Sequence, residues 1–317
     1  MLQGLIPGMP HPVSRLILGT ATLPTDRDPN EWLSGMLALG INTFDTARVY
    51  GDSEATLGRW FEACGTRSQI NLITKGCHPD GEIRRVSEAC LRADLETSLE
   101  KLRTDHVDLY LLHRDDPEVP VETIIDTLNA LKEEGKILSF GASNWMHQRI
   151  EAANAYAEKH GLTAFAASSV NYTLAEPVGD PWGGNSVSIA GEANLEGKKW
   201  YVHTQMPVLA YSPLAHGFFA GKMKSSDKSH YQDFLDEFAI RGYVSDWNFE
   251  RLRRCEVIAQ ERGATVPMIA LGWILRQRLN LYAIVSSTSE QRMKQNMAAL
   301  IRPLIDEDCR FLNLNAF

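Results

Sequence analysis

The chain has 317 residues, 44% of them hydrophobic, and a formal net charge of -8. This apolar content is too high for a disordered chain and is enough to build a sizeable core. The negative charge and the lack of a long basic run disfavour binding to nucleic acid or to an anionic membrane.

The sequence also lacks the usual signs of export or membrane insertion. Its first residues, MLQGLIPGMPHP, have neither the charged start nor the long apolar core of a signal peptide, and no stretch approaches the ~18 apolar residues of a membrane span. The five cysteines are scattered and form no C-x-x-C pair, which argues against a disulfide framework or a zinc site and fits a reducing compartment. We therefore expect a soluble, cytoplasmic protein without a bound metal.

Short apolar runs recur along the chain and read as buried strands. They are nearly continuous in apolar character rather than alternating, as is typical of parallel strands that are covered on both sides. The predicted strands are 15–20, 41–46, 70–76, 107–113, 137–143, 165–172, 207–213 and 281–287.

Longer segments with helical periodicity separate these strands. In 82–103 and 121–134, apolar residues recur at three- and four-residue steps, and Gly135 then supplies a left-handed stop. Pro267 suits the first position of a helix. The predicted helices are 30–39, 82–103, 121–134, 146–160, 249–262, 267–278 and 289–299.

Eight strands, each followed by a helix, predict an α/β protein with a closed (β/α)8 barrel, the TIM-barrel architecture. A doubly wound open sheet is the alternative, but the number of repeats favours closure. Residues 1–14 are expected to form an additional hairpin that turns at Pro7-Gly8. Since α/β barrels of this length form one domain, we expect residues 1–317 to be a single domain.

Two long segments, 177–205 after the sixth strand and 214–248 after the seventh, interrupt this regular alternation. Loops of this length in a compact domain are usually lids or binding loops, although simple decoration is almost as common for the first of them. Tryptophans in or near these segments are candidates for a substrate pocket or for loop anchors.

Polar side chains gather where the predicted strands end. In parallel barrels the active site lies at the C-terminal ends of the strands. Asp45 ends the second strand, with Tyr50 just beyond it, and Lys75 and His113 end the third and fourth strands. Taken singly, each has an ordinary structural explanation, but together these four ionisable groups predict a catalytic site.

The four residue types suit proton transfer to a carbonyl oxygen. A tyrosine with an ordinary pKa of about 10 transfers its proton poorly near neutral pH, and a nearby lysine ammonium favours the phenolate. Asp45 is placed to pair with Lys75 and keep it charged, while His113 is placed to orient a substrate oxygen. We therefore expect Tyr50 to be the general acid.

The sequence resembles the aldo-keto reductase superfamily over essentially its full length. The resemblance rests on LGTAT, FDTARVYGDSE, LITKG, LYLLH, GASNW, LAYSPLAHG and SSTSEQRMKQN, each at the expected strand end and in the expected order. It implies a (β/α)8 barrel that binds NADPH in an extended form, without a Rossmann domain. It also implies that Asp45, Tyr50, Lys75 and His113 form a catalytic tetrad for the reversible reduction of an aldehyde or ketone.

The resemblance implies a set of cofactor-binding residues as well. Ser143 and Asn144 would contact the nicotinamide carboxamide, Tyr211 would stack on its ring, and Arg292 and Asn296 would contact the 2'-phosphate and the adenine. A helix N-terminus near residue 289 also suits phosphate binding, and Arg292 lies one turn into that helix. The full set is Gly19, Thr20, Ser143, Asn144, Ser169, Tyr211, Ser212, Leu214, Gly217, Ser286, Ser287, Thr288, Arg292, Gln295 and Asn296.

Two positions depart from the family pattern. Many members have a lysine where this chain has Ser286, and members commonly have a glutamine where it has Ser169. The first difference weakens, without reversing, the expectation of NADP(H) over NAD. The shorter side chain of Ser169 cannot reach the nicotinamide carboxamide directly, so Asn171, a water molecule or a shifted register is expected to substitute.

Two other functions fit parts of the pattern. Some superfamily members act as regulatory partner subunits, as the potassium-channel β subunits do, with slow or vestigial chemistry. A Schiff-base aldolase that uses Lys75 is the third candidate, but Asp45 opposes it by keeping the amine protonated. The sequence determines neither the carbonyl substrate nor the oligomeric state.

Overall fold

A closed barrel of eight parallel strands forms the centre of the molecule. The computed structural model describes residues 2–301 and 304–314. The barrel closes in the order β10-β3-β4-β5-β6-β7-β8-β9, which confirms the predicted TIM-barrel fold. Its strands are β3 (Leu16–Gly19), β4 (Thr43–Asp45), β5 (Asn71–Gly76), β6 (Val107–Leu112), β7 (Ile137–Ser143), β8 (Ser168–Asn171), β9 (Val208–Tyr211) and β10 (Leu281–Val285).

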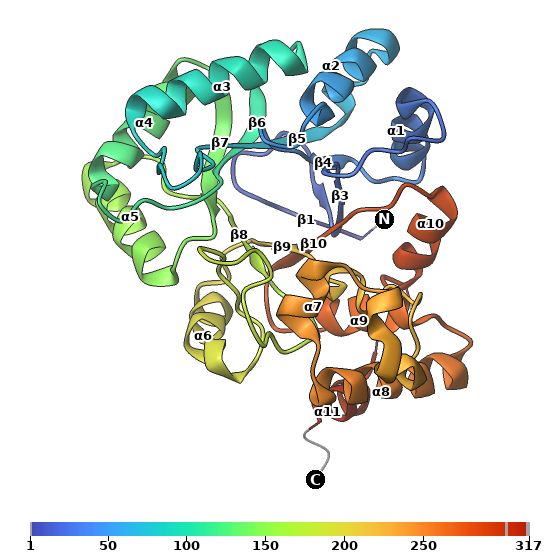
Figure 1. Ribbon diagram of the computed structural model, residues 1–317. Helices are drawn as coiled ribbons and strands as arrows, with labels where there is room; N and C mark the ends of the chain where they lie inside the picture. The colour runs from blue at the N-terminus through green and yellow to red at the C-terminus, as the bar shows by residue number, and fades with distance from the viewer. Residues whose placement is uncertain (1, 302–303, 315–317) are drawn as a thin grey trace.

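Helices surround the barrel, as Figure 1 shows in a view along its axis. None of the helices in residues 2–301 and 304–314 combines the length and the apolar character needed to cross a membrane. The helices are α1 (Pro29–Ala38), α2 (Ser53–Cys64), α3 (Glu88–Leu102), α4 (Val121–Glu133), α5 (His147–His160), α6 (Leu195–Thr204), α7 (Glu237–Tyr243), α8 (Asp246–Arg262), α9 (Val266–Leu275), α10 (Glu290–Ala298) and α11 (Asp306–Leu312).

Several helix boundaries differ from those predicted. Helix α3 begins at Glu88 rather than at residue 82, because Ser87 caps it by accepting a hydrogen bond from the backbone N–H of Cys90. Helix α8 differs in the other direction, since it begins at Asp246, three residues before the predicted start at 249, and Ser245 caps it. Helices α2 and α11 are not among the predicted helices. The long segments 177–205 and 214–248 contain α6 and α7, respectively, with irregular loops and short 3-10 turns around them.

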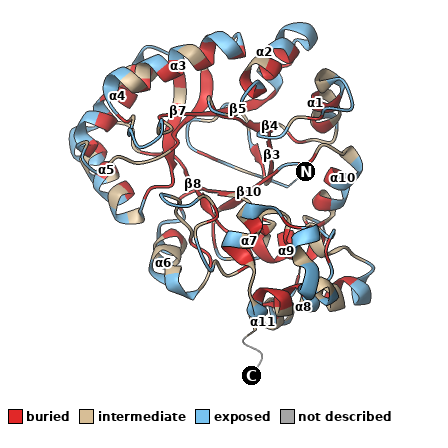
Figure 2. Cartoon of the chain, in the orientation of Figure 1, coloured by how far each residue is buried: buried red, intermediate tan, exposed pale blue. Residues whose placement is uncertain are grey.

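The apolar residues form two layers of core, one between the strands and the helices and one inside the barrel. Figure 2 shows that the strands are buried and that most surrounding helices turn an exposed face to solvent. Ile73 of β5 and Leu111 of β6 belong to the inner layer. Since side chains alternate along a strand, Lys75 and His113 continue these inward-facing rows to the mouth of the barrel.

The predicted N-terminal hairpin is present and packs against the opposite end of the barrel. Strands β1 (Gln3–Gly4) and β2 (Val13–Ser14) pair antiparallel. The Tyr282 hydroxyl donates to Leu5 O at 3.0 Å, and the Ser139 hydroxyl donates to Pro7 O at 2.8 Å. Ile6 inserts into the inner core, so the hairpin closes the N-terminal end of the barrel.

Candidate active site

A cavity of about 490 Å³ opens at the C-terminal ends of the strands. All four residues of the predicted tetrad line it. The predicted cofactor residues that also line it are Gly19, Ser143, Asn144, Ser169, Tyr211, Ser212, Leu214, Gly217 and Ser286. The predicted residues that lie outside it are Thr20, Ser287, Thr288, Arg292, Gln295 and Asn296.

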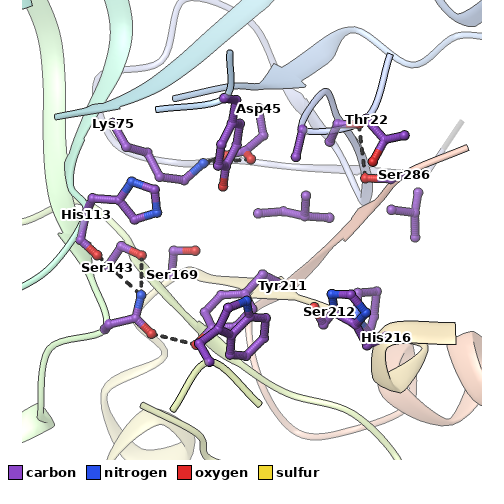
Figure 3. A pocket seen from close by; sticks show the side chains of 18 of the residues that line it. Thr22, Asp45, Lys75, His113, Ser143, Ser169, Tyr211, Ser212, His216 and Ser286 are labelled. Atoms are coloured by element: carbon purple, nitrogen blue, oxygen red, sulfur yellow. Dashed lines mark hydrogen bonds and ion pairs between the residues drawn. The ribbon is translucent and has the colours of Figure 1, made fainter. Parts of the chain in front are cut away.

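Lys75 and Asp45 form a buried ion pair in the cavity wall (Figure 3). The Lys75 ammonium lies 2.6 Å from Asp45 Oδ1 and 2.7 Å from Oδ2, and it donates to Thr46 O at 2.9 Å. Each residue is only 3% exposed. Burial opposes the charge on Lys75, but the Asp45 carboxylate and the neighbouring Tyr50 outweigh it and raise the Lys75 pKa. The amine is therefore held charged.

Tyr50 lies against this ammonium group. The Lys75 nitrogen is 5.0 Å from the centre of the Tyr50 ring. The loop that carries Tyr50 is tied to β5, because the Arg48 backbone N–H donates to Lys75 O at 3.0 Å. A turn then holds the tyrosine, whose own N–H donates to Ala47 O at 3.0 Å. The cation and the phenol thus share one cavity, which is the arrangement that proton transfer from Tyr50 requires.

His113 is the neutral member of the group. It is 8% exposed, and burial, followed by the nearby charges of Lys75 and Arg114, lowers its pKa well below the usual value of 6.5. Its ring lies edge-on to Tyr50, with centres 5.9 Å apart. Its Nδ1 atom has no hydrogen-bond partner among the described residues. A neutral imidazole that lines the cavity next to a phenol is suited to orient a substrate oxygen.

Asn144 and Tyr211 form the opposite wall and hold one another. The Tyr211 hydroxyl donates to Asn144 Oδ1 at 2.5 Å, and the same oxygen accepts from Val187 N at 3.1 Å. The amide nitrogen of Asn144 donates to Ser143 Oγ at 3.1 Å and to His113 O at 3.3 Å. These bonds fix the position of the Tyr211 ring. They also engage both ends of the Asn144 amide, so a carboxamide ligand would have to compete for them.

Trp182, from the long segment after β8, reaches into the same cavity. Its ring packs edge-on to Tyr211 at 5.2 Å between centres. Asp180 orders this loop by accepting from Trp182 N at 2.9 Å and from Ser186 N at 3.1 Å. The segment 177–205 therefore contributes a wall of the cavity and is more than surface decoration.

Ser169 lines the cavity, and its hydroxyl donates to Leu209 O at 3.1 Å. Asn171 does not line it. Its amide nitrogen donates to Tyr211 O at 3.3 Å and to the Tyr243 hydroxyl at 3.0 Å, while its oxygen accepts from Ser188. The Asn171 side chain is therefore engaged by other residues and is not free to replace the usual family glutamine as a ligand of the nicotinamide carboxamide.

The start of α10 lies beside the end of β10. Ser289 caps the helix and accepts from Arg292 N at 3.4 Å, and the Arg292 guanidinium donates to Thr288 Oγ1 at 3.3 Å. Arg292 and Gln295 are exposed, whereas Asn296 is buried. Thr20 is buried too, and its hydroxyl pairs with Ser53 Oγ at 2.6 Å and Asp45 O at 2.9 Å.

The cavity has features that suit a dinucleotide. An added Cβ at Gly217 would meet no atom within 4 Å, so the backbone there faces open space, as close approach of a phosphate requires. At Gly19 an added Cβ would come within 2.8 Å of Ser286 Oγ, whose hydroxyl donates to Gly19 O at 3.1 Å. Tyr211 presents a fixed aromatic ring. The residues present therefore fit a nicotinamide cofactor.

Three further ionisable residues line the cavity and were not predicted from the sequence: His78, Arg114 and His216. His78 lies edge-on to His113, with ring centres 4.8 Å apart, and His216 Nδ1 lies 2.7 Å from Asp236 Oδ2. Each follows directly or closely after a strand end. In the sequence, only their positions shortly after strand ends could have indicated that they line the cavity.

Comparison with known proteins agrees with this geometry. The model of the aldo/keto reductase family matches residues 15–313. The chain belongs to the aldo/keto reductase family. Enzymes of this family are oxidoreductases that generally use nicotinamide cofactors.

Several known proteins resemble the chain over most of its length. An aldo-keto reductase of Strobilurus tenacellus is 29% identical over 86% of this chain and 76% of its own, and an uncharacterized oxidoreductase of Bacillus subtilis is 28% identical over 95% and 91%. A putative voltage-gated potassium channel subunit beta of Schizosaccharomyces pombe is 26% identical over 83% and 76%. A thermostable aldo-keto reductase solved with the inhibitor epalrestat shares the fold, with a TM-score of 0.72, 22% identity and 99% coverage of both chains.

Proposed function

We propose that the protein reduces an aldehyde or ketone to the alcohol, reversibly, with NADPH as the reductant. The observation that carries this proposal is the buried Lys75 ammonium, which touches the Asp45 carboxylate and lies over the Tyr50 ring. A charged amine beside a phenol favours the phenolate, and so makes the phenolic proton easier to transfer near neutral pH.

NADPH, when bound, supplies the hydride that the carbonyl carbon gains. Tyr50 donates its phenolic proton to the carbonyl oxygen, and the Lys75 ammonium stabilises the phenolate that is left. Asp45 keeps Lys75 charged and fixed in place. Neutral His113 donates a hydrogen bond to the carbonyl oxygen and holds it next to Tyr50. In the direction of alcohol oxidation, the Tyr50 phenolate takes the proton back.

The preference for NADPH rests on the region around α10. Arg292 is exposed in the first turn of this helix and makes no ion pair among the described residues, so its guanidinium is available to a 2'-phosphate. The free N–H groups at the helix start favour the same anion. Ser143, Asn144 and Ser169 line the inner part of the cavity, where the nicotinamide would lie beside the Tyr211 ring. We also propose a cytoplasmic location, because all five cysteines are free.

The test replaces Tyr50 by phenylalanine. We expect Tyr50→Phe to lower kcat for a panel of model aldehydes by about 10²- to 10⁴-fold, since the general acid is lost. Binding of NADPH, followed by quenching of tryptophan emission, should be unchanged and tighter than that of NADH. Tyr110→Phe is the matched control, because Tyr110 is buried outside the cavity. Full activity of Tyr50→Phe would disprove the mechanism.

A regulatory role is the second candidate, favoured by the similarity to the putative potassium channel subunit beta. Tight NADPH binding with negligible turnover over the whole aldehyde and ketone panel, together with a co-purifying partner, would support it. An aldolase that uses Lys75 as a Schiff base is disfavoured by the ion pair with Asp45, which keeps the amine protonated. Trapping of a carbonyl compound on Lys75 by borohydride would reverse that judgement.

A further inference from the structure

Arg114 has an unusual position for a permanently charged side chain. It follows His113 at the end of β6, lines the same cavity and is partly buried. Among residues 2–301 and 304–314, no carboxylate pairs with its guanidinium and no acceptor hydrogen-bonds to it. A guanidinium that is partly removed from water without a partner is costly, and such groups are usually paired.

The acidic residues that follow Arg114 are occupied by other arginines. Asp115 accepts from Arg149 Nε at 3.0 and 3.1 Å. Asp116 accepts from Arg84 at 3.1 Å. The local carboxylates are therefore engaged elsewhere, and Arg114 lines the cavity without a carboxylate partner among the described residues.

The cavity as a whole carries a net positive charge because of this residue. Lys75 and Asp45 cancel one another, and burial keeps His113 neutral. Among the described residues that line the cavity, Arg114 is thus the one permanent charge without a counter-ion. The whole chain has a net charge of -8, so the positive charge at this site contrasts with the rest of the molecule and would attract an anion to it.

Arg114 directly follows His113 in the chain and lines the same cavity as Tyr50 and Tyr211. Its charge contributes to the lowered pKa of His113, after burial and Lys75. It also opposes the burial that raises the pKa of Tyr211. His113, Tyr211 and Tyr50 all line this one cavity. An anionic group held by Arg114 would therefore be attached to a molecule that also reaches Tyr50 and His113.

We propose that Arg114 binds a carboxylate on the carbonyl substrate, so that the preferred substrates are oxo-carboxylic acids in which the aldehyde or ketone and the acid lie a short distance apart. This inference rests on the proposed reductase function. A planar guanidinium matches a carboxylate with two parallel hydrogen bonds. One unpaired cation balances one carboxylate, whereas a phosphate dianion would need a second.

The test uses two substrates that differ only in charge, 4-formylbenzoate and its methyl ester, with NADPH. We expect Arg114→Gln to lower kcat/KM for the acid by about 10- to 100-fold, mainly through KM, because the lost contact is remote from the reacting carbonyl. The ester should change by less than about threefold. Arg114→Lys should recover part of the loss, since it keeps the charge but not the planar fork. Arg92→Gln, which removes an arginine of α3 that pairs with Glu88 and Glu134 outside the cavity, should leave both substrates unaffected.

The outcomes separate this inference from the proposed function. Equal effects of Arg114→Gln on the acid and the ester, or no effect on either, would overturn the inference while leaving the reductase activity intact. Weaker NADPH binding by Arg114→Gln with an unchanged acid-to-ester ratio would assign Arg114 to the cofactor instead. If the native protein reduced neither compound and no member of the aldehyde and ketone panel, the reductase proposal would fail. Titration of 4-formylbenzoate into NADPH-loaded protein, followed by tryptophan emission, would then still decide whether Arg114→Gln weakens binding of the carboxylate.

Discussion

At the scale of single residues, the same burial leads to opposite charge states in two neighbouring bases of the site. Lys75 and His113 are both almost completely buried, and burial alone disfavours the charged form of each. Lys75 nevertheless remains charged because the Asp45 carboxylate touches it. His113 has no carboxylate partner among the described residues and therefore remains neutral. The difference between a fixed cation and a neutral hydrogen-bonding group thus comes from one aspartate.

The lowered pKa of His113 predicts how stability depends on pH. An unfolded chain takes up a proton on this histidine near pH 6.5, whereas the folded protein resists it, so stability is present above that pH and is lost on acidification. For this group alone the loss reaches about 1.4 kcal/mol per pH unit below 6.5. His113→Gln cannot titrate and should lose less free energy of unfolding between pH 7 and pH 5.

Urea unfolding of the native protein and of His113→Gln at both pH values measures this difference. Other groups titrate equally in the two proteins, so they cancel in the comparison. His11→Gln, at a partly exposed position away from the cavity, is a suitable control. An identical loss of stability in native protein and His113→Gln would mean that His113 is protonated as readily in the folded state as in the unfolded chain.

At the scale of secondary-structure elements, the close packing of β5 on β6 and α3 fixes the position of Lys75 near the C-terminal end of β5. Gly76 follows Lys75 directly and faces the helix layer. A Cβ added at Gly76 would come within 1.8 Å of the Tyr110 hydroxyl oxygen on β6 and 3.0 Å of Asp94 Cβ on α3. That tyrosine hydroxyl has no hydrogen-bond partner among the described residues. Only glycine allows the strands and the helix to approach this closely.

This packing predicts that removing the Tyr110 hydroxyl restores part of the stability that Gly76→Ala loses. Gly76→Ala should reduce the free energy of unfolding by about 2–4 kcal/mol, because the added methyl group must displace Tyr110. Tyr110→Phe alone should be nearly neutral, since it removes a buried hydroxyl that has no partner. The double variant should be more stable than Gly76→Ala, as measured by urea unfolding. Strictly additive effects in this double-mutant cycle would show that the two positions do not interact.

At the scale of the whole molecule, the two ends of the barrel differ in role, one carrying the candidate active site and the other being closed by the hairpin. The chemistry-bearing residues gather at the C-terminal ends of the strands, while the N-terminal hairpin closes the other end. Ile6 of the hairpin is 4% exposed and packs into the inner core with Ile17 and Tyr282. In barrels of this type, residues at the closed end contribute to stability and those at the open end to function.

This separation predicts that Ile6→Ala affects stability alone. The cavity it leaves should lower the free energy of unfolding by about 2–4 kcal/mol. At a temperature where the variant remains folded, kcat/KM should stay within about twofold of the native value, because the barrel core insulates the site. Thermal unfolding and steady-state kinetics measure the two effects. A large fall in kcat/KM without a fall in stability would show that the hairpin acts on the site.

Part of this architecture follows from the sequence because it depends on short stretches of chain. An apolar run that ends in an ionisable residue identifies both a strand and its end, so the sequence places Asp45, Lys75 and His113 at strand ends. Helix α2 is not among the predicted helices, although Asp52, Glu54 and Gly65 are typical start and stop residues, because it directly follows the loop of Tyr50. Helix α3 starts later than predicted because the Ser87 side chain accepts a hydrogen bond from the backbone and caps the helix at that residue.

The sequence by itself determined the order of strands and helices, the closed barrel and the end of each strand at which ionisable groups collect. Only the tertiary structure decided which of those groups are paired. Arg114 and Arg149 are the same residue type, but Arg114 lines the cavity without a carboxylate partner among the described residues, whereas Arg149 pairs with Asp115. Asn144 and Asn171 likewise differ only through contacts made across the barrel. Such pairings join residues far apart in the chain, and they depend on loop shape and burial, which local sequence patterns do not encode.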